Sequence, residues 1–82
     1  MKAPRDLSGI ELEKLLHRFG YEATRQHGSH IRLTTSIRGA EHHITVPAHK
    51  FLKIGTLESI LADVAGYLAL PRPEFERELF AA

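Results

Sequence analysis

Hydrophobic positions near the start of the chain recur at the spacing of an amphipathic helix. Four of them follow the i, i+3, i+4, i+7 pattern: Leu12, Leu15, Leu16 and Phe19. Ser8 and Glu11 form a capping-box pattern ahead of this apolar stripe. Gly20 stands where helices commonly end in a left-handed C-cap. The pattern predicts a helix over residues 8–19.

The same spacing returns in the second half of the chain, at Leu57, Ile60, Leu61 and Val64. Thr56 is placed to cap this second helix, and the apolar pattern continues past Gly66. Pro71 and Pro73 then break the chain, and we expect a last short helix over residues 74–80.

Between the two long helices the pattern changes to the two-residue alternation of β-strands. It predicts strands over residues 21–26, 30–35 and 42–46, with a three-residue hairpin loop at 27–29 and with Pro47 ending the third strand. One face of this sheet is apolar and carries Ile31, Leu33, Ile44 and Val46. The opposite face is polar and carries His30, Arg32, Thr34, His43 and Thr45.

This element order predicts an α+β fold, α-β-β-β-α, with a three-stranded antiparallel sheet and a short C-terminal helix. Both helical stripes must be buried and the sheet has one apolar face, so both helices are expected on that face. The polar face stays open, and the architecture resembles the double-stranded-RNA-binding domain. At 82 residues we expect a single domain over 1–82, with its core at about 8–68 and a helical extension at 71–82.

Composition narrows the class further. The chain has no cysteine, which excludes a disulfide scaffold and thiolate zinc sites, and it has no apolar run of the roughly 20 residues that a membrane span needs. We therefore expect a soluble cytoplasmic protein without a membrane partner. Residues 1–55 carry nine Lys/Arg against five Asp/Glu, whereas residues 56–82 carry two against five. This polarity fits an anion-binding face with a separate acidic end, and it also fits ordinary surface scatter.

The stretch Gly28-Ser29-His30 carries the clearest chemical signal. A glycine turn permits close approach to a phosphate, and alternation places His30 and Arg32 on the same polar face beside that turn. Imidazole is the only side-chain group whose ordinary pKa, about 6.5, lets it take and give protons near neutrality. The pattern therefore indicates one of two things. Either His30 acts as a base or acid beside a phosphate that Arg32 binds, or the stretch is simply a solvated hairpin turn.

Two lysines and a further histidine lie between the third strand and the second helix. Lys50 and Lys53 precede the helix N-terminus, where they form either a phosphate seat or a pair of solvated side chains. His49 is either a second proton-transfer group or a residue that fixes this loop through a backbone hydrogen bond. The neighbouring pair Phe51-Leu52 either fills the core or forms a partner site.

The six histidines do not follow a metal-ligand pattern. His42 and His43 are adjacent in a strand and so face opposite sides, and no His-x₃-His or carboxylate cluster has ligand spacing. His17 and His27 are expected to be merely exposed. We predict no metal site and no cofactor.

Three fragments match a known family in their order and in their elements: Gly28-Ser29-His30, Val46-Pro47-Ala48-His49 and Gly55-Thr56-Leu57. Together with the capped first helix they make the stretch from Ser8 to Leu68 resemble the HicA toxin family, small bacterial mRNA interferases with a double-stranded-RNA-binding-like fold. The resemblance implies endoribonuclease activity on mRNA with His30 as the catalytic residue. RNA cleavage without a metal needs groups that move protons at the 2′-hydroxyl and at the leaving 5′-oxygen, and cations that stabilise the phosphate. The resemblance also implies a HicB-type antitoxin that binds the toxin and blocks this histidine.

A second reading remains open, that of a non-catalytic RNA-binding or protein-interaction module with the same fold. A net charge of only +1 favours it. The acidic helix expected at residues 74–80 is either a solvated helix that packs two apolar side chains or a surface for partner docking or self-association.

Overall fold

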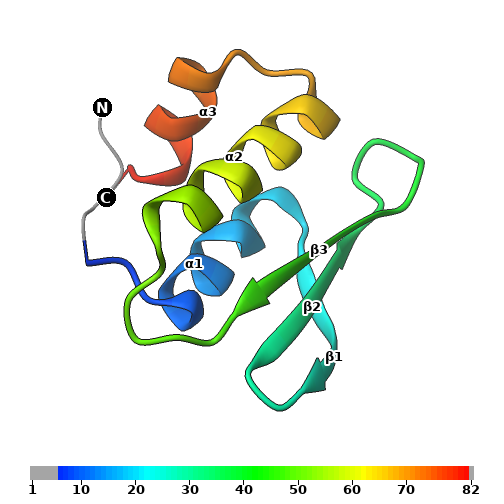
Figure 1. Ribbon diagram of the computed structural model, residues 1–82. Helices are drawn as coiled ribbons and strands as arrows, with labels where there is room; N and C mark the ends of the chain where they lie inside the picture. The colour runs from blue at the N-terminus through cyan, green and yellow to red at the C-terminus, as the bar shows by residue number, and fades with distance from the viewer. Residues whose placement is uncertain (1–5, 82) are drawn as a thin grey trace.

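The computed structural model describes residues 6–81. A helix α1 (Gly9–Leu16) continues into a 3₁₀ turn η1 (His17–Phe19) and is followed by the strands β1 (Glu22–His27), β2 (His30–Thr35) and β3 (His42–Pro47). Two further helices, α2 (Ile54–Leu68) and α3 (Arg72–Leu79), complete the chain. Figure 1 shows α1 and α2 side by side over one face of the sheet, and α3 packed on the helical layer away from the β1–β2 hairpin. The predicted α+β arrangement is confirmed.

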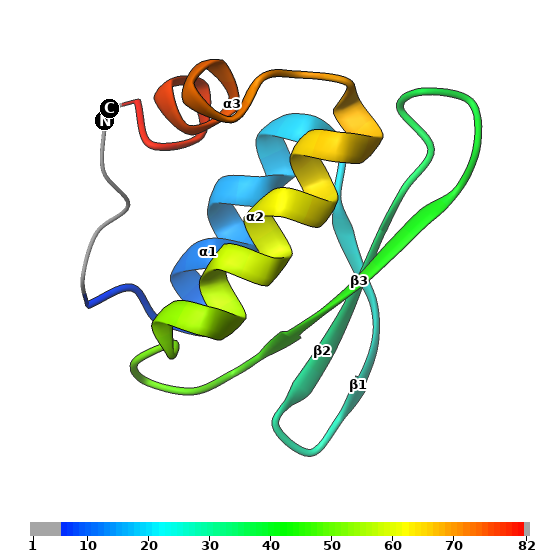
Figure 2. The same cartoon turned by 45° about the horizontal axis from the view of Figure 1, so that its top comes forward.

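The three strands form one antiparallel sheet in the order β1-β2-β3, so β2 is central. In the β2–β3 register Leu33 lies opposite Ile44 and Ile31 opposite Val46, and all four side chains are buried under the helices. Arg32 lies opposite Thr45 on the other face, which no helix covers (Figure 2). The alternation predicted from the sequence therefore sets both faces of this sheet.

Helix α1 begins as its capping box predicts. The Ser8 side chain accepts a hydrogen bond from the Glu11 backbone N–H at 3.0 Å, and the Glu11 carboxylate accepts one from the Ser8 N–H at 2.9 Å. That backbone hydrogen bond lowers the pKa of Glu11 from its ordinary value. Gly20 ends η1 with a φ of +82°, the left-handed conformation expected of a C-cap.

The C-terminal helix α3 is part of the main core. Phe75 and Leu79 are fully buried, and the Phe75 ring centroid lies 5.2 Å from that of Phe19. The Arg18 guanidinium donates to the backbone carbonyls of Glu78 at 2.6 Å and Ala81 at 2.7 Å, which fastens the end of α3 to η1. These contacts close the single hydrophobic cluster that all the helices and the sheet share.

No single helix within residues 6–81 is long and apolar enough to cross a membrane; α2 and α3 reach that length and composition only as a pair bent by 105°.

Several element boundaries differ from the sequence prediction. The hairpin loop has two residues, not three, because His27 is the last residue of β1 and pairs with His30. Helix α2 starts at Ile54 with Lys53 as its N-cap, so the prediction that Thr56 caps it is wrong. The hydrogen bond from the Leu57 N–H to the Lys53 carbonyl, 2.9 Å long, sets this earlier first turn.

Proline positions account for two other differences. Helix α3 begins at Arg72, ahead of the predicted 74–80, because Pro73 occupies the first turn, where its missing N–H leaves no hydrogen bond unmade. Pro47 is included in β3 as its last residue, which an edge strand tolerates.

Candidate active site

The β1–β2 hairpin presents His30 at the start of β2. Gly28 has a φ of +56°, whereas Ser29 has no positive φ, which is the pattern of a type II′ turn that suits a two-residue hairpin. The Gln26 side-chain amide donates to the Gly28 carbonyl at 3.0 Å, and the Ser29 carbonyl accepts from the Ala48 N–H. The turn is thereby fixed against the end of β3, and His30 is exposed beside it.

A small hollow of about 140 Å³ lies on the open sheet face next to this turn. Five residues line it: Arg25, His27, His30, Arg32 and Thr45. The structure thus brings together His30 and Arg32, as the sequence predicts. It adds Arg25 and His27 from β1, neither of which the sequence analysis assigned to a site.

Arg25 lies on this face because the two-residue turn sets the register of the hairpin: His27 lies opposite His30, Gln26 opposite Ile31 and Arg25 opposite Arg32. Further from the turn, a bulge in β1 shifts the register between Ala23 and Arg25, so that Ala23 lies opposite Leu33. A bulge of this kind places two successive residues opposite one and redirects the side chains that follow. Strict alternation gives no hint of it. The Gly-Ser turn, taken as a two-residue loop, is the signal that would have paired His27 with His30.

A second hollow, of about 410 Å³, continues along the same face and is lined by Thr24, Arg25, Arg32, Thr34, Glu41 and His43. Two hydrogen-bonding contacts of His43 connect residues that line this hollow. His43 Nδ1 lies 2.8 Å from Thr34 Oγ1, and His43 Nε2 lies 3.2 Å from Glu41 Oε1. Because His43 pairs with Thr34, four residues beyond His30, the two histidines are separated by about 13 Å along the sheet. His43 is therefore too far away to act on the same phosphate as His30.

Backbone hydrogen bonds join the segment between β3 and α2 to the start of α1. The His49 carbonyl accepts from the Gly9 N–H at 3.0 Å, and the Leu52 N–H donates to the Leu7 carbonyl at 2.9 Å. The His49 backbone thus has the structural role considered from the sequence, while its side chain is exposed and lines neither hollow of the open face.

Lys50 and Lys53 are also exposed, and they too lie outside both hollows. The Lys50 Nζ stands 5.8 Å from the centroid of the Phe51 ring, which is 58% exposed. Leu52 is buried in the core. Of the pair Phe51-Leu52, Leu52 therefore fills the core, whereas Phe51 lies on the surface.

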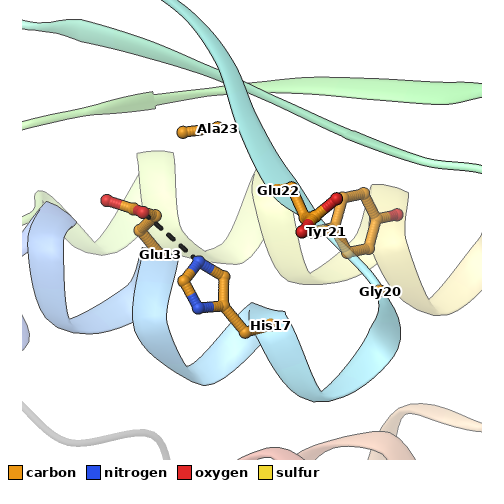
Figure 3. A pocket seen from close by; sticks show the side chains of 6 residues that line it. All are labelled: Glu13, His17, Gly20, Tyr21, Glu22 and Ala23. Atoms are coloured by element: carbon orange, nitrogen blue, oxygen red, sulfur yellow. Dashed lines mark ion pairs between the residues drawn. The ribbon is translucent and has the colours of Figure 1, made fainter.

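A third hollow, of about 550 Å³ and larger than these two, lies elsewhere, between η1 and the start of β1 (Figure 3). It contains no predicted site residue. Glu13 and Glu22 line it, and His17 Nε2 is engaged with the Glu13 carboxylate at 3.3 Å. Two carboxylates disfavour an anionic ligand, so the larger hollow is a poorer candidate for an anion-binding site than the smaller basic one.

His42 faces the helices, opposite to His43, as predicted. Its Nδ1 lies 2.6 Å from the Tyr21 hydroxyl, its Nε2 lies 3.1 Å from Asp63 Oδ1, and its ring stacks on Tyr67 at 4.6 Å. Within residues 6–81, no three His, Asp or Glu side chains are grouped so as to hold a metal ion.

The fold and the open face define the class: an α+β domain of the double-stranded-RNA-binding type with histidines and arginines gathered on its uncovered sheet face. The sequence model of the HicA toxin of bacterial toxin–antitoxin systems matches residues 9–65, well over half of the chain. The chain belongs to the HicA toxin family, and an antitoxin is therefore the class of partner that its family implies. No curated protein and no solved structure gives a significant match.

Proposed function

We propose that this protein is an endoribonuclease toxin that cleaves mRNA in the cytoplasm by histidine acid–base catalysis, without a metal or other cofactor, and that a HicB-type antitoxin neutralises it. One observation carries the proposal. In a chain of the HicA family, His30 of the Gly-Ser-His motif stands exposed beside Arg32 in a basic hollow on the uncovered sheet face.

Each residue of the motif has a role in this proposal. His30 transfers a proton, either from the attacking 2′-hydroxyl or to the leaving 5′-oxygen. Arg32 stabilises the negative charge that grows on the phosphate as the bond breaks. The lack of a side chain at Gly28 lets the backbone approach the RNA, and Ser29 offers its hydroxyl as a further phosphate contact.

Outside the hollow, Lys50 and Lys53 are proposed to hold RNA phosphates further along the strand. The hydrogen bond between Ser29 and Ala48 places their segment at the same end of the molecule as the hairpin. The sequence also offers the His49 side chain as a secondary group for proton transfer, but this side chain lies outside the hollow that holds His30. An antitoxin that covers the hairpin would remove His30 from contact with RNA, which is how we propose that inhibition works.

The experiment that tests the proposal is cleavage of a labelled mixed-sequence RNA in the presence of chelator by the wild type, by His30→Ala and by His17→Ala. His17 is an exposed histidine on η1, away from the sheet face, and serves as the matched control. We expect His30→Ala to lower the rate by about 10²–10⁴-fold, the usual contribution of a general acid or base. The wild type and His17→Ala should yield 2′,3′-cyclic phosphate ends.

Folding is checked by the melting temperature, which should stay the same because the His30 side chain is exposed and makes no hydrogen bond within residues 6–81. Full activity of His30→Ala would refute its catalytic assignment. RNA binding by a well-folded wild type that cleaves no RNA would instead support the alternative, a non-catalytic RNA-binding or interaction module.

A further inference from the structure

We propose that β1 supplies the second proton-transfer group of the reaction, His27, which works with His30 across the hairpin. The inference rests on the proposed ribonuclease function and adds to it the residue that completes an acid–base pair. Metal-free cleavage needs two such groups, and the family motif names only one.

The pairing of the strands places these two imidazoles together. His27 lies directly opposite His30 as the closing pair of the two-residue hairpin, and directly opposed residues have Cβ atoms about 5 Å apart. Both side chains are exposed and both line the same 140 Å³ hollow. Within residues 6–81 neither ring is engaged in a hydrogen bond or an ion pair, so both rings are open to contact with a substrate.

The other histidines of the described chain do not meet these conditions. His43 is held between Thr34 and Glu41 and lies about 13 Å along the sheet from His30. His49 is exposed but does not line the hollow. His27 is the histidine that shares the site.

The reaction can be written with these two groups alone. The neutral imidazole takes the proton of the 2′-hydroxyl, the 2′-oxygen forms a bond to phosphorus, and the bond from phosphorus to the 5′-oxygen breaks. The protonated imidazole gives its proton to the departing 5′-oxygen, which leaves a 2′,3′-cyclic phosphate and a 5′-hydroxyl. One proton is taken and one is given, and exchange with water restores the two rings.

The neighbouring cross-strand pair suits the phosphate that must sit between the histidines. Arg25 lies opposite Arg32 in the same hollow, next along the strands from His27 and His30. Because the attacking and leaving oxygens lie on opposite sides of phosphorus, the base and the acid must approach from opposite sides. Two rings on adjacent strands, with two guanidinium groups beside them, provide that arrangement.

The test compares His27→Ala, His30→Ala and the control His17→Ala on two RNA substrates that differ in one atom. The first is ordinary RNA. The second carries sulfur in place of the leaving 5′-oxygen at the mapped cleavage position, so its leaving group departs without an acid. On ordinary RNA we expect both His27→Ala and His30→Ala to lose about 10²–10⁴-fold in rate, and the bell-shaped pH profile of the wild type to lose one limb in each.

On the sulfur substrate, one of the two variants should regain most of its rate, and that variant identifies the acid. Wild-type rate of His27→Ala on ordinary RNA would overturn the proposal. So would a loss that the sulfur substrate relieves in neither variant, because it would mark His27 as a phosphate contact. If cleavage depends on His30 but not on His27, only this inference fails; if the wild type cleaves no RNA, the proposed function fails first.

Discussion

Gly9, the first residue of α1, lies against the end of β3. Its N–H donates to the His49 carbonyl, and a Cβ built at this position would lie only 1.8 Å from the Pro47 carbonyl oxygen. The atom in the way belongs to the backbone, so no side-chain rotation relieves the clash. The absence of a side chain at Gly9 therefore allows the start of α1 to pack directly against the end of β3.

We predict that Gly9→Ala destabilises the fold by about 3 kcal/mol or more, since the helix and the strand end must separate to admit the methyl group. The measurement is urea unfolding followed by circular dichroism. Gly66→Ala is the matched control, because a Cβ added at Gly66 inside α2 meets no atom within 4 Å beyond the backbone of its own helix. This variant should gain about 0.8–1 kcal/mol of stability from helix propensity. Equal stability of Gly9→Ala and the wild type would contradict the close approach described here.

The contacts of Tyr21 are of a kind that the hydrophobic pattern of the sequence does not predict. It is fully buried, and burial together with the charge of Asp63 raises the pKa of its hydroxyl well above the ordinary value. The partner of that hydroxyl is His42, which in turn contacts Asp63 and Tyr67 of α2. These groups are far apart in the sequence, and hydrophobic periodicity specifies faces of elements, not partners across them.

At the scale of the element, the two-residue turn of the hairpin determines which charges meet on the open face. It sets Arg25 directly opposite Arg32, and within residues 6–81 neither guanidinium forms an ion pair. Like charges directly opposite each other on antiparallel strands destabilise a sheet. The two arginines therefore lower the folding stability, but they gather positive charge beside His30. Gathered positive charge is what favours the binding of an anion.

Arg25→Gln should therefore raise the free energy of unfolding by about 0.2–1 kcal/mol at low ionic strength, because it removes the repulsion from Arg32. The gain should shrink as salt is added, since the pair is exposed and screened. Chemical denaturation at low and high salt measures both effects. Arg38→Gln removes the same charge from the exposed 36–41 loop and should show no such gain. A lower stability of Arg25→Gln at low salt would mean that the two arginines do not repel each other in the fold.

The elements themselves were largely predictable from the sequence. The capping box at Ser8, the two helical stripes and the alternation of β2 and β3 are local patterns, and each acts within a few residues. The bulge in β1 was not predictable, because it depends on pairing with the neighbouring strand. The first turns of α2 and α3 were not either, because apolar periodicity does not fix the residue at which a helix begins. Only the β2 half of the candidate site, His30 and Arg32, was predicted, because the predicted three-residue loop gives β1 a different register from the two-residue turn.

At the scale of the whole molecule, charge separates along the fold. The hairpin end of the open face carries two arginines and two histidines, with Glu41 further along the same face, whereas α3, at the far end of the helical layer, carries Glu74, Glu76 and Glu78 (Figure 1). Arg72 neutralises part of the acidic charge at this end, because its guanidinium forms ion pairs with Glu76 at 3.2 Å and with Glu58 of α2 at 2.7 Å. The net charge of +1 therefore understates how basic the hairpin end is.

An RNA strand held at the hairpin is expected to extend towards Lys50 and Lys53. If both lysines contact phosphates, the Lys50→Ala/Lys53→Ala variant should bind single-stranded RNA more weakly, and the slope of its binding constant against salt should fall by about 0.7 per lost phosphate contact. Fluorescence anisotropy over a salt series, in the His30→Ala background, measures binding without cleavage. The control is Lys14→Ala/Arg77→Ala, which removes the same charge from exposed positions on α1 and α3. An unchanged slope in the Lys50/Lys53 variant, or an equal change in both variants, would show that these lysines contribute only to the overall charge and form no phosphate site.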